Sequence, residues 1–291
     1  MGSEGRDGRD GGATLAVIVV SWNTRPLLEN CLRSLFAGNV DGGTEVFVVD
    51  NASGDGSAAM VRTFFPDVRL LQTGENLGFA RANNRALRQA DARYCLLLNP
   101  DTIVPAGTLR QLVEVAEASP RVAACGPLLL NEDGSPQFCW ARFPGAAFEW
   151  SGRHDLSQSP YPLVDFADPE RRSRMKPFVA DWVGGACLLV RSSALRQVGL
   201  LDEGYFMYTE ETDWCYRFRA AGYETLCVPS VTVTHLGGGS SRLVPERTRD
   251  RMYRSRLRFY RKWYGPIGSL APCLMATLRH RASLLRSGRS R

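Results

Sequence analysis

The feature that most constrains the fold is an alternation, across residues 15–125, of short apolar runs and helical patterns. The run Leu15–Val20 is wholly apolar and rich in β-branched residues, which is typical of a strand buried on both faces. From Pro26 to Phe36, apolar residues instead recur at helical spacing. The alternation continues with strands expected at 45–49, 68–72, 94–98 and 122–125 and helices at 57–65, 78–90 and 107–118. It predicts an α/β fold, with a Rossmann-like, mostly parallel central sheet flanked by helices.

The second half of the chain is less regular. Residues 131–177 contain many Pro, Ser and Arg residues without a clear period, and we expect a hairpin followed by a long surface loop there. Further strands are expected at 182–190, 223–228 and 231–234, and further helices at 192–198 and 212–221. A strongly basic helix at 246–264 and a weakly apolar helix with basic flanks at 267–285 are expected to follow them.

Charge is distributed unevenly along the chain. Residues 242–291 carry 14 Lys and Arg against 2 Asp and Glu, a net charge of +12, whereas the preceding residues carry a net charge of −6. A basic arm of this kind can bind anionic lipid or nucleic acid. We therefore expect three regions, which are a disordered lead-in at 1–13, an α/β domain at 14–241 and a basic amphipathic helical arm at 242–291.

Composition points to a cytoplasmic protein. The eight cysteines form no CxxC pair and mostly lie in apolar runs, so we expect buried free thiols in a reducing compartment. The polar, glycine-rich start lacks the apolar stretch of a signal peptide. No run of about 18 uncharged apolar residues, as an ordinary membrane-spanning helix requires, is present.

Polar residues follow several of the predicted strands. In an open α/β sheet, ligands gather beyond the carboxyl ends of the strands, so these side chains should converge at one edge. Asp50 and Asn51 could hydrogen-bond a nucleotide base or cap the next turn, and Asp101 could hold a divalent cation or simply form an Asn-Pro-Asp turn. The residues at this edge are Ser21, Asn23, Asp50, Asn51, Asn99 and Asp101.

The segment GENLGFARANNRAL places Gly74 and Gly78 before a helix, whose N-terminus favours anions. It matches neither the GxGxxG fingerprint nor the GxxxxGK[ST] phosphate loop, which disfavours an ATPase. Paired glycines in WVGGACLLVR, Gly184 and Gly185, indicate either close approach of a ligand to the backbone or a bulge. His235, after a strand, is a candidate ligand for a metal or a phosphate, or a structural residue.

The densest acidic cluster lies in FMYTEETDWCYRFR and contains Glu210, Glu211 and Asp213. Carboxylates crowded among aromatic residues repel and desolvate one another, which raises at least one pKa and produces a general base. Such a base could deprotonate an acceptor hydroxyl. The alternative is a helix first turn in which acidic residues are stabilised by the helix dipole.

Together these segments resemble the inverting glycosyltransferases of family 2, which have the GT-A fold, and especially their bacterial rhamnosyltransferase-like branch. The resemblance covers residues 15–241 in seven ordered segments: VIVVSWN, VFVVDNAS, ENLGFARANN, LLLNPDT, WVGGACLLVRSSAL, GLLDEGYFMYTEETDWCYRFRAAGY and VTHLGGGSS. It implies a nucleotide-binding half at 14–127 and an acceptor-binding half at 128–241. It also implies single-displacement transfer of a sugar from a nucleoside diphosphate, dTDP- or UDP-linked, with L-rhamnose from dTDP-rhamnose as a candidate donor.

The resemblance also implies roles for individual residues. Asp101 stands at the metal position of the DxD-type motif, here Asn99-Pro100-Asp101 without its first carboxylate, and would hold Mg²⁺ or Mn²⁺ with His235. The acidic motif, commonly Glu-Asp-x-Asp, is here Glu210-Glu211-Thr212-Asp213, so Glu211 stands where the base usually does and either Glu210 or Glu211 is the base. The nucleotide-sugar contacts would be Ser21, Asn23, Asp50, Asn51, Asn76, Gly78, Phe79, Asn84, Asn99 and Asp101. The acceptor contacts would be Trp182, Gly184, Gly185 and Trp214.

Aromatic and basic residues interleave in RMYRSRLRFYRKWYG, as in a helix that lies on an anionic membrane surface. The arm would then bring the enzyme to a lipid-linked or glycan acceptor at the inner face of the membrane, in cell-envelope polysaccharide synthesis, without binding nucleic acid. A helix packed on the domain with a solvated basic face is the alternative. The alternative functions are those of a non-catalytic carbohydrate- or nucleic-acid-binding protein and of a nucleotidyltransferase on a similar sheet.

Overall fold

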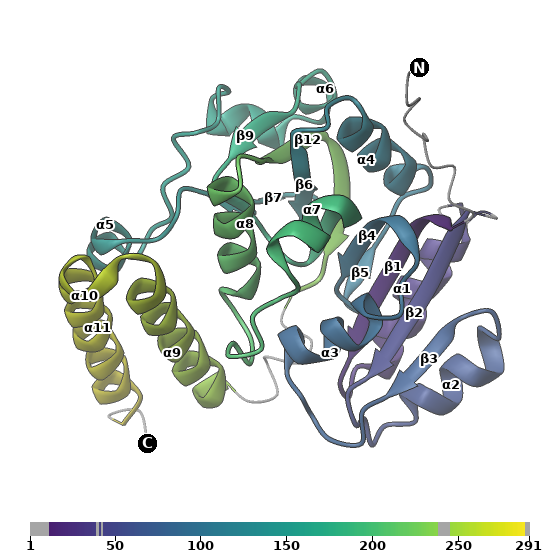
Figure 1. Ribbon diagram of the computed structural model, residues 1–291, viewed down its shortest axis with the longest axis horizontal. Coiled ribbons are helices and arrows are strands. Elements are labelled where there is room, and N and C mark those ends of the chain that lie inside the picture. The colour runs from purple at the N-terminus through teal and green to yellow at the C-terminus, as the bar shows by residue number, and fades with distance from the viewer. Residues whose placement is uncertain (1–11, 39–40, 42, 238–244, 289–291) are drawn as a thin grey trace, which may run out of the picture.

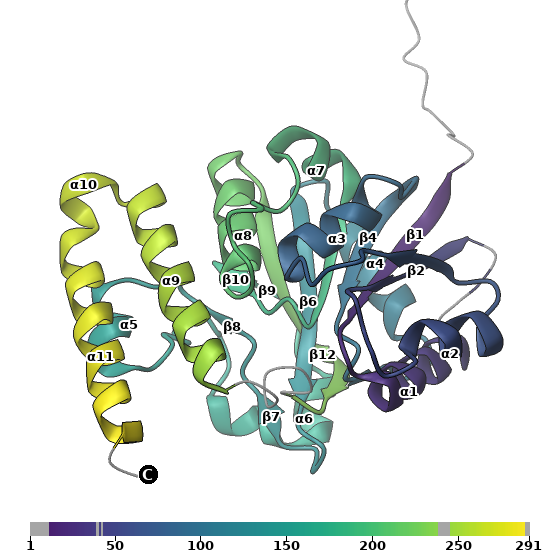
Figure 2. The ribbon, with the colours of Figure 1, turned by 90° about the horizontal axis from the view of Figure 1, so that it is seen from below.

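The structure is a computed structural model that describes residues 12–38, 41, 43–237 and 245–288. The lead-in through residue 11 and the expected boundary at 241–242 lie outside the described residues. The centre is a ten-stranded sheet with the strand order β3-β2-β1-β4-β11-β6-β12-β5, where β7 pairs with β6 and β9 with β12. Helices cover both faces of this sheet, and a helical hairpin lies at one side (Figures 1 and 2). The α/β fold with a mostly parallel sheet is therefore confirmed.

One half of the sheet is wholly parallel. Strand β1 (Ala13–Ser21) lies between β2 (Thr44–Asp50) and β4 (Ala92–Leu98), and β3 (Arg69–Gln72) pairs with β2. Because β1 is covered on both faces, its apolar run is almost entirely buried, as the sequence predicts. The helices of this half are α1 (Arg25–Phe36), α2 (Ser57–Phe64) and α3 (Phe79–Leu87), whereas α4 (Thr108–Glu117) packs on β6, β11 and β12.

The other half is mixed. Strand β11 (Cys187–Arg191) runs antiparallel between β4 and β6 (Val122–Leu130), and β12 (Glu224–His235) runs parallel to β6. The short strand β5 (Thr102–Ile103) pairs with the end of β12, which brings Thr102 opposite His235. Helices α7 (Ser192–Val198) and α8 (Glu210–Ala220) connect these strands.

The single strand predicted at 182–190 is wrong. Strand β10 (Trp182–Val183) instead pairs with β8 (Trp140–Ala141) in a separate two-stranded sheet, and the chain enters the main sheet only at Cys187. Between them, the Gly184 amide donates to the Cys139 carbonyl oxygen and the Asn99 amide donates to the Ala186 carbonyl oxygen. Neither Gly184 nor Gly185 has positive φ, and a side-chain carbon on either would make only ordinary contacts.

The two strands predicted at 223–228 and 231–234 form the single strand β12. The register against β6 shifts between Val228 and Thr232, where Pro229 cannot donate a ladder hydrogen bond. The break in the apolar pattern of the sequence is therefore a bulge within one strand.

Residues 131–177 contain more regular structure than the predicted hairpin and loop. The elements of this segment are β7 (Pro136–Gln137), β8, α5 (Ala146–Ser151), the 3₁₀ helix η1 (Leu163–Ala167) and α6 (Pro169–Ser173). Strand β9 (Phe178–Ala180) follows and pairs with β12. Each element is only two to six residues long, so no sequence period can mark it.

The basic arm forms the two predicted helices, α9 (Pro245–Trp263) and α11 (Leu270–Gly288), joined by the short helix α10 (Gly265–Gly268). The two long helices lie side by side, and α11 also packs on α5 (Figures 1 and 2). No helix in the described part of the chain is long and apolar enough to cross a membrane. The eight cysteines are free thiols, seven of them buried and Cys273 partly so.

Candidate active site

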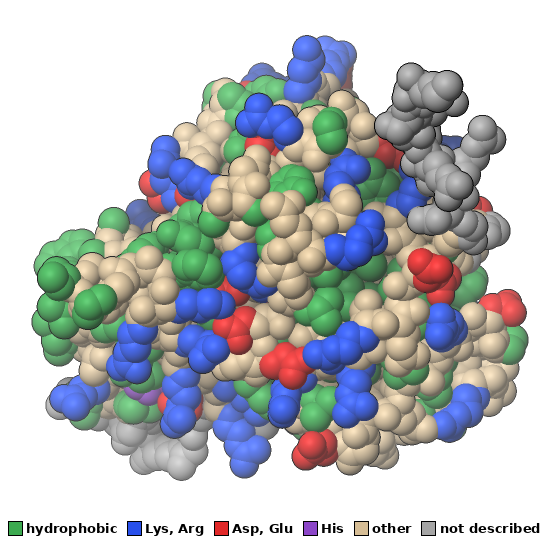
Figure 3. All heavy atoms as spheres, viewed as in Figure 1, with side chains coloured by type: hydrophobic (Ala, Val, Ile, Leu, Met, Phe, Trp, Pro, Cys, Tyr) green, Lys and Arg blue, Asp and Glu red, His purple; other side chains and the backbone are tan. Residues whose placement is uncertain are grey.

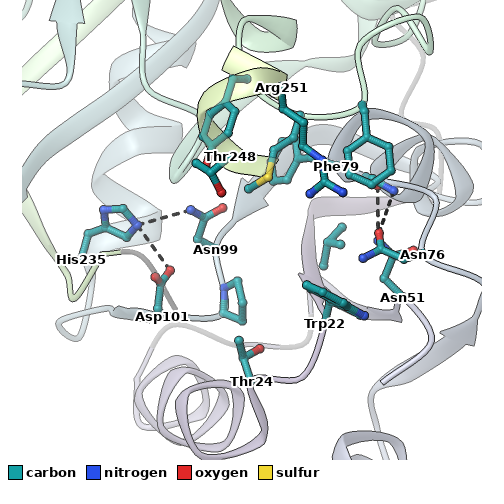
Figure 4. Close-up of a pocket in the computed structure, with 16 residues that line it drawn as sticks. Trp22, Thr24, Asn51, Asn76, Phe79, Asn99, Asp101, His235, Thr248 and Arg251 are labelled. Carbon is teal, nitrogen blue, oxygen red and sulfur yellow. Dashed lines mark hydrogen bonds and ion pairs between the residues drawn. The ribbon is translucent and has the colours of Figure 1, made fainter. Parts of the chain in front are cut away.

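A pocket opens at the carboxyl ends of β1, β2 and β4, where the polar residues were expected to converge. It is closed on the opposite side by the segment that precedes α8 and by the start of α9 (Figure 4). Seven of the predicted site residues line the pocket: Asn51, Asn76, Gly78, Phe79, Asn99, Asp101 and His235. The other described lining residues are Val20, Trp22, Thr24, Pro100, Phe206, Met207, Tyr208, Thr248 and Arg251.

Asp101 and His235 meet at one end of the pocket. The pairing of β5 with β12, together with the Leu236 amide that donates to the Asp101 carbonyl oxygen, holds the two residues side by side. Imidazole Nε2 lies 3.3 Å from Asp101 Oδ1 and 3.3 Å from the amide nitrogen of the Asn99 side chain (Figure 4). A carboxylate oxygen and an imidazole nitrogen therefore face the same space.

Gln137, which the sequence analysis does not single out, fixes the orientation of the histidine. The amide nitrogen of Gln137 donates to the His235 carbonyl oxygen at 2.6 Å and to Asn131 Oδ1 at 2.7 Å. Its oxygen therefore faces His235 Nδ1, at 3.0 Å, and Nδ1 must donate. Nε2 then presents either a second proton or a lone pair toward Asp101.

Asp101 and His235 fit a divalent cation that takes most of its coordinating oxygens from a bound substrate and from water. Carboxylate oxygen suits Mg²⁺ and Mn²⁺, which keep several positions for water or phosphate oxygens. A histidine whose other ring nitrogen donates to an amide oxygen is the usual arrangement of a metal-ligating imidazole. Within the described ranges, no group of three or more His, Cys, Asp or Glu side chains could hold a metal, so a cation here would rely on bound phosphate for its other ligands.

Asn51 and Asn76 build the opposite wall of the pocket. Asn51 accepts a hydrogen bond from the Leu77 amide at 2.9 Å and donates to Asn76 Oδ1 at 3.0 Å, and that oxygen also accepts from the Gly78 amide. The Phe79 amide donates to the Phe206 carbonyl oxygen at 2.7 Å. The glycine loop is therefore held against the segment before α8, and Phe79 is presented to the pocket (Figure 4).

Ser21, Asn23 and Asp50 lie at the same sheet edge but do not line the pocket. The Ser21 hydroxyl is buried against that of Thr24, and Asn23 accepts from the Gly54 amide at 2.8 Å. Asp50 is 2% exposed, and its Oδ1 has no hydrogen-bond partner among the described residues. An unsatisfied buried carboxylate oxygen is costly, so Asp50 is the one of the three that calls for an outside donor.

Asn84 is also outside the pocket lining. Its side chain accepts from the Leu201 amide and donates to the Leu201 carbonyl oxygen and to Glu203. It therefore secures the segment that leads to α8.

Glu210 and Glu211 are the first two residues of α8. Glu210 is 4% exposed, and its Oε2 has no hydrogen-bond partner in the described part of the chain. Burial, and then repulsion by Glu211, raises the pKa of Glu210 well above its ordinary value, and burial also raises the pKa of Glu211. The pair is thus poised to take up a proton.

Glu211 adjoins the pocket through Gly185 and Phe79. A side-chain carbon placed on Gly185 would lie 3.6 Å from Cβ and Cγ of Glu211 and 3.8 Å from the Phe79 ring. The neighbouring Ala186 carbonyl oxygen accepts from the Asn99 amide, next to Asp101. Neither glutamate lines the pocket itself, and Glu211 lies beside the glycine turn whose next residue, Ala186, bonds the backbone of Asn99.

The structure does not bring Asp213 and Trp214 to this pocket. Asp213 is fully buried and is bound by Arg217, Lys262 and Trp263. Trp214 is fully buried, and its indole donates to the Gly199 carbonyl oxygen. Residues three and four positions apart share one face of a helix, so Asp213 and Trp214 lie with the buried Glu210 on the side of α8 that faces the interior of the domain.

The other predicted acceptor residues lie on the Glu211 side. Gly184 and Gly185 form the turn between β10 and β11. Trp182 is partly buried, donates to the Arg142 carbonyl oxygen, and lies edge-on to His154 with the ring centroids 5.4 Å apart. None of the three lines the pocket beside Asp101, and Gly185 is the one that adjoins Glu211.

Six residues that line the pocket are not among those predicted from the sequence: Trp22, Phe206, Met207, Tyr208, Thr248 and Arg251. Trp22 follows directly after a predicted strand end, so its position was a usable signal. Arg251 belongs to the basic arm that the sequence predicts. Among the described residues that line the pocket, it is the single Lys or Arg. It enters the pocket between Asn99 and Phe79 (Figure 4).

Comparison with known proteins agrees with this arrangement. The model of the family described as Glycosyl transferase family 2 matches residues 16–197. The N-acetylglucosaminyl-diphospho-decaprenol L-rhamnosyltransferase of Mycobacterium tuberculosis is 35% identical over 234 residues, which are 76% of this chain and 75% of the relative. Rhamnosyltransferase WbbL of Escherichia coli is 30% identical over 181 residues, 56% of this chain and 62% of that protein.

A solved structure shows the same fold. The mannosyltransferase PcManGT from Pyrobaculum calidifontis, in complex with GDP-Man and Mn²⁺, superposes with a TM-score of 0.61 at 20% identity, over 95% of this chain and 75% of that chain. The binding-protein and nucleotidyltransferase alternatives gain no support from these matches. The chain belongs to glycosyl transferase family 2, and it is a glycosyltransferase of the rhamnosyltransferase-like kind with a GT-A-like fold.

Proposed function

We propose that this enzyme transfers L-rhamnose from dTDP-rhamnose to a hydroxyl of a polyprenyl-diphosphate-linked sugar, with inversion at the anomeric carbon. The donor and acceptor follow the names of the relatives, of which the Mycobacterium tuberculosis protein is an L-rhamnosyltransferase acting on a decaprenol-linked sugar. The observation that carries the proposal is the pairing of Asp101 with His235 at one end of the pocket, with Glu211 linked to the same pocket through Phe79.

In this proposal the nucleoside lies in the pocket against the wall formed by Trp22, Asn51 and Asn76. The unsatisfied Asp50 oxygen behind that wall would accept from a ribose hydroxyl or a base N–H. A diphosphate then extends toward Asp101 and His235, where a bound Mg²⁺ or Mn²⁺ would neutralise negative charge on the leaving group. Arg251 reaches the same space from α9 and adds a positive charge.

Glu211 is the proposed base, since it is partly exposed and adjoins Gly185, whereas Glu210 is buried. The carboxylate of Glu211 takes the proton from the acceptor hydroxyl as that oxygen bonds to the anomeric carbon. The bond from that carbon to the diphosphate oxygen breaks in the same step, and the nucleoside diphosphate leaves with the electron pair. Burial raises the pKa of Glu211, and burial followed by repulsion from Glu211 raises the pKa of Glu210.

The enzyme would meet its acceptor at the inner face of the cell membrane, as a peripheral protein of cell-envelope glycan synthesis. The basic arm supplies attraction to anionic lipid. The glycine turn at Gly184–Gly185 and the side chain of Trp182 provide the surface for the acceptor sugar, next to Glu211.

The test is turnover with a panel of nucleotide sugars, followed as nucleoside diphosphate released in the presence of Mg²⁺ or Mn²⁺. Glu211→Gln should lower kcat by about 10² to 10⁴-fold, the usual contribution of a general base. Arg251→Gln should raise the KM for the donor about tenfold or more, because a hydrogen bond to a charged group is lost.

Glu224→Gln is the matched control, because this carboxylate pairs with Arg121 at the far end of β12 and should leave turnover unchanged. Asp101→Ala should lose activity that added Mn²⁺ does not restore. If Glu211→Gln and Asp101→Ala both transfer sugar as fast as the wild type, the assigned site is incorrect. If UDP-sugars are used and dTDP-rhamnose is not, the donor assignment alone fails.

A further inference from the structure

The aromatic residues of α9 face the domain and not the solvent. Phe259 and Tyr260 are fully buried, and Trp263 stacks on Tyr216 with the ring centroids 4.4 Å apart. The interleaved segment therefore packs on α8 and α5 through its aromatic side and exposes its basic side. The aromatic half of the expected membrane contact is thus unavailable, which corrects the interpretation of this helix from sequence alone.

Exposed apolar side chains are instead found on α10 and α11. Leu270, Leu274 and Leu278 recur every four residues along one face of α11, and Ile267 precedes them on α10. Their exposed fractions are 66% for Leu270, 62% for Leu274, 57% for Leu278 and 83% for Ile267, and Leu285, further along the same face, is 71% exposed. We call these five residues the apolar face. Figure 3 shows hydrophobic side chains gathered over α10 and α11, beside Lys and Arg side chains over α9.

The helices that carry the apolar face are held rigidly. The buried carboxylate of Glu149 on α5 pairs with Arg256 of α9 at 2.7 Å and with Arg279 of α11 at 3.8 Å. Tyr253 of α9 stacks on His280 of α11 with the ring centroids 4.3 Å apart. The leucines are therefore presented by a fixed scaffold and have no partner within the described chain large enough to cover them. An exposed apolar patch of this kind marks an interaction surface.

The surroundings of the apolar face are strongly positive. Residues 245–288 carry 11 Lys and Arg against 2 Asp and Glu, and Arg254, Arg258, Arg261 and Lys262 line a shallow groove on α9. Within this groove Arg254 pairs with Asp250, and Arg258 and Lys262 both pair with Asp202. Arg281 is exposed within the apolar face, and its long aliphatic stem can lie along an apolar layer while the guanidinium stays in water. Two copies of this chain docked through these faces would bring two cationic arms together, whereas anionic lipid complements both the charge and the leucines.

We propose that the apolar face of α10 and α11 inserts into the interface of an anionic lipid bilayer, with the groove of α9 lying over the headgroups. The helices lie in the plane of the membrane, since none of those described could span it. The inference rests on the proposed function in one respect, namely that a polyprenyl-linked acceptor gives the enzyme a reason to be at the bilayer. It adds which helices make the contact and which side chains enter the lipid.

The test uses the full chain and sedimentation with vesicles of phosphatidylglycerol or of phosphatidylcholine. The wild type should bind the anionic vesicles, and the triple variant Leu270→Ser/Leu274→Ser/Leu278→Ser should lose more than about tenfold in vesicle affinity. Full burial of one leucine is worth about one to two factors of ten in affinity, and each leucine gains a fraction of that at an interface. Phe64→Ser on α2, which removes another exposed apolar side chain, is the matched control and should bind as the wild type does.

Equal vesicle binding by the triple variant and the wild type would overturn the proposal, as would failure of the wild type to bind phosphatidylglycerol. A dimer in solution that the triple variant dissolves would show that the face joins two copies of this chain. Release of nucleoside diphosphate without vesicles separates this proposal from the proposed function. The triple variant should keep that activity. If the wild type binds vesicles but shows no turnover, the proposed function is refuted and the proposed membrane surface is not.

Discussion

At the scale of single residues, the orientation of His235 shows how a distant side chain sets the chemistry of a site. The imidazole lies between Gln137 on one side and Asp101 with Asn99 on the other. Because the Gln137 amide nitrogen is committed to two carbonyl-type oxygens, its oxygen is directed at Nδ1, and Nε2 is left facing the carboxylate. Gln137 is a positioning residue for this histidine.

The first prediction concerns Gln137→Ala. The variant should weaken the apparent affinity for Mn²⁺ in turnover about 10 to 100-fold, the usual effect of removing a partner that orients a metal ligand, and excess Mn²⁺ should restore most of kcat. Gln158→Ala, which removes a glutamine bonded to Asp181 outside the pocket, is the control. An unchanged Mn²⁺ dependence in Gln137→Ala would mean that His235 does not need this partner.

The second prediction concerns Glu210 and pH. Because burial and the Glu211 charge raise its pKa above the ordinary 4.5, the native state binds a proton that the unfolded state releases. The free energy of unfolding should therefore fall as pH rises from about 4.5 through the raised pKa of the native state. Glu210→Gln removes this loss of stability. The free energies of unfolding of the variant and the wild type should therefore be similar near pH 4, and that of the variant should become the larger toward pH 8.

Urea denaturation at several pH values measures this difference. Because the pKa of Glu211 is also raised, the free energy of unfolding of the Glu210→Gln variant should still fall as pH rises, but by less than that of the wild type. A constant difference between the variant and the wild type across this range would show that Glu210 ionises normally. Turnover should rise with pH through the raised pKa of the pair, since the base acts in its deprotonated form.

At the scale of elements, the pocket depends on one contact between two loops. The glycine loop before α3 meets the segment before α8, where Phe206 accepts the Phe79 amide and where Tyr208 and Thr209 both have positive φ. Gly78 has φ +78°, and a side-chain carbon there would overlap the Phe206 carbonyl oxygen and lie 2.8 Å from its ring. Only glycine permits this approach.

The third prediction compares Gly78→Ala with Gly74→Ala. Both glycines have nearly the same φ, +78° and +77°, but a methyl group on Gly74 meets nothing within 4 Å. Gly74→Ala should cost only the strain of the left-handed conformation, about 1–2 kcal/mol, whereas Gly78→Ala should cost several kcal/mol and raise the KM for the donor. Equal losses of unfolding free energy would show that the two loops separate at little cost.

At the scale of the whole molecule, the arm is part of the site and not an appendage. Helix α9 contributes Thr248 and Arg251 to the pocket, and the Ser255 hydroxyl donates to the Met207 carbonyl oxygen at 2.9 Å. Its far end is joined to α8 by Asp213, which is 2.7 Å from Lys262 and 2.8 Å from the indole nitrogen of Trp263. One helix thus connects the donor pocket to the proposed membrane surface.

The fourth prediction concerns Asp213→Ala. Removing this buried carboxylate leaves Arg217 without its carboxylate partner and Lys262 with Asp202 alone, so the free energy of unfolding should fall by about 3–5 kcal/mol. The KM for the donor should rise as Arg251 loses its support, while kcat at saturating donor stays near that of the wild type. Asp250→Asn, an exposed pair with Arg254, should cost only about 0–1 kcal/mol. A stable Asp213→Ala enzyme with a lost kcat would instead make Asp213 catalytic.

The sequence by itself determined the alternating strands and helices of the parallel half and the sheet edge at which several polar residues gather. Leu15–Val20 can only be a strand covered on both faces, and residues that follow such strands, such as Asn51, Asn99 and Asp101, must share one edge. It also identified Glu210 and Glu211, because acidic residues among aromatic ones are a local signal.

Only the tertiary structure decided which of the polar residues face the pocket and what the arm contributes. Gln137 and Arg251 reach the site across 98 and 150 positions from His235 and Asp101, a separation that leaves no periodic pattern. The same is true of Asp213, whose partners lie on α9, and of the leucines of α11, whose exposure follows from the packing of the opposite helix face on α5 and α9. Periodicity fixes local elements, whereas which side of an element becomes buried is settled by what packs against it.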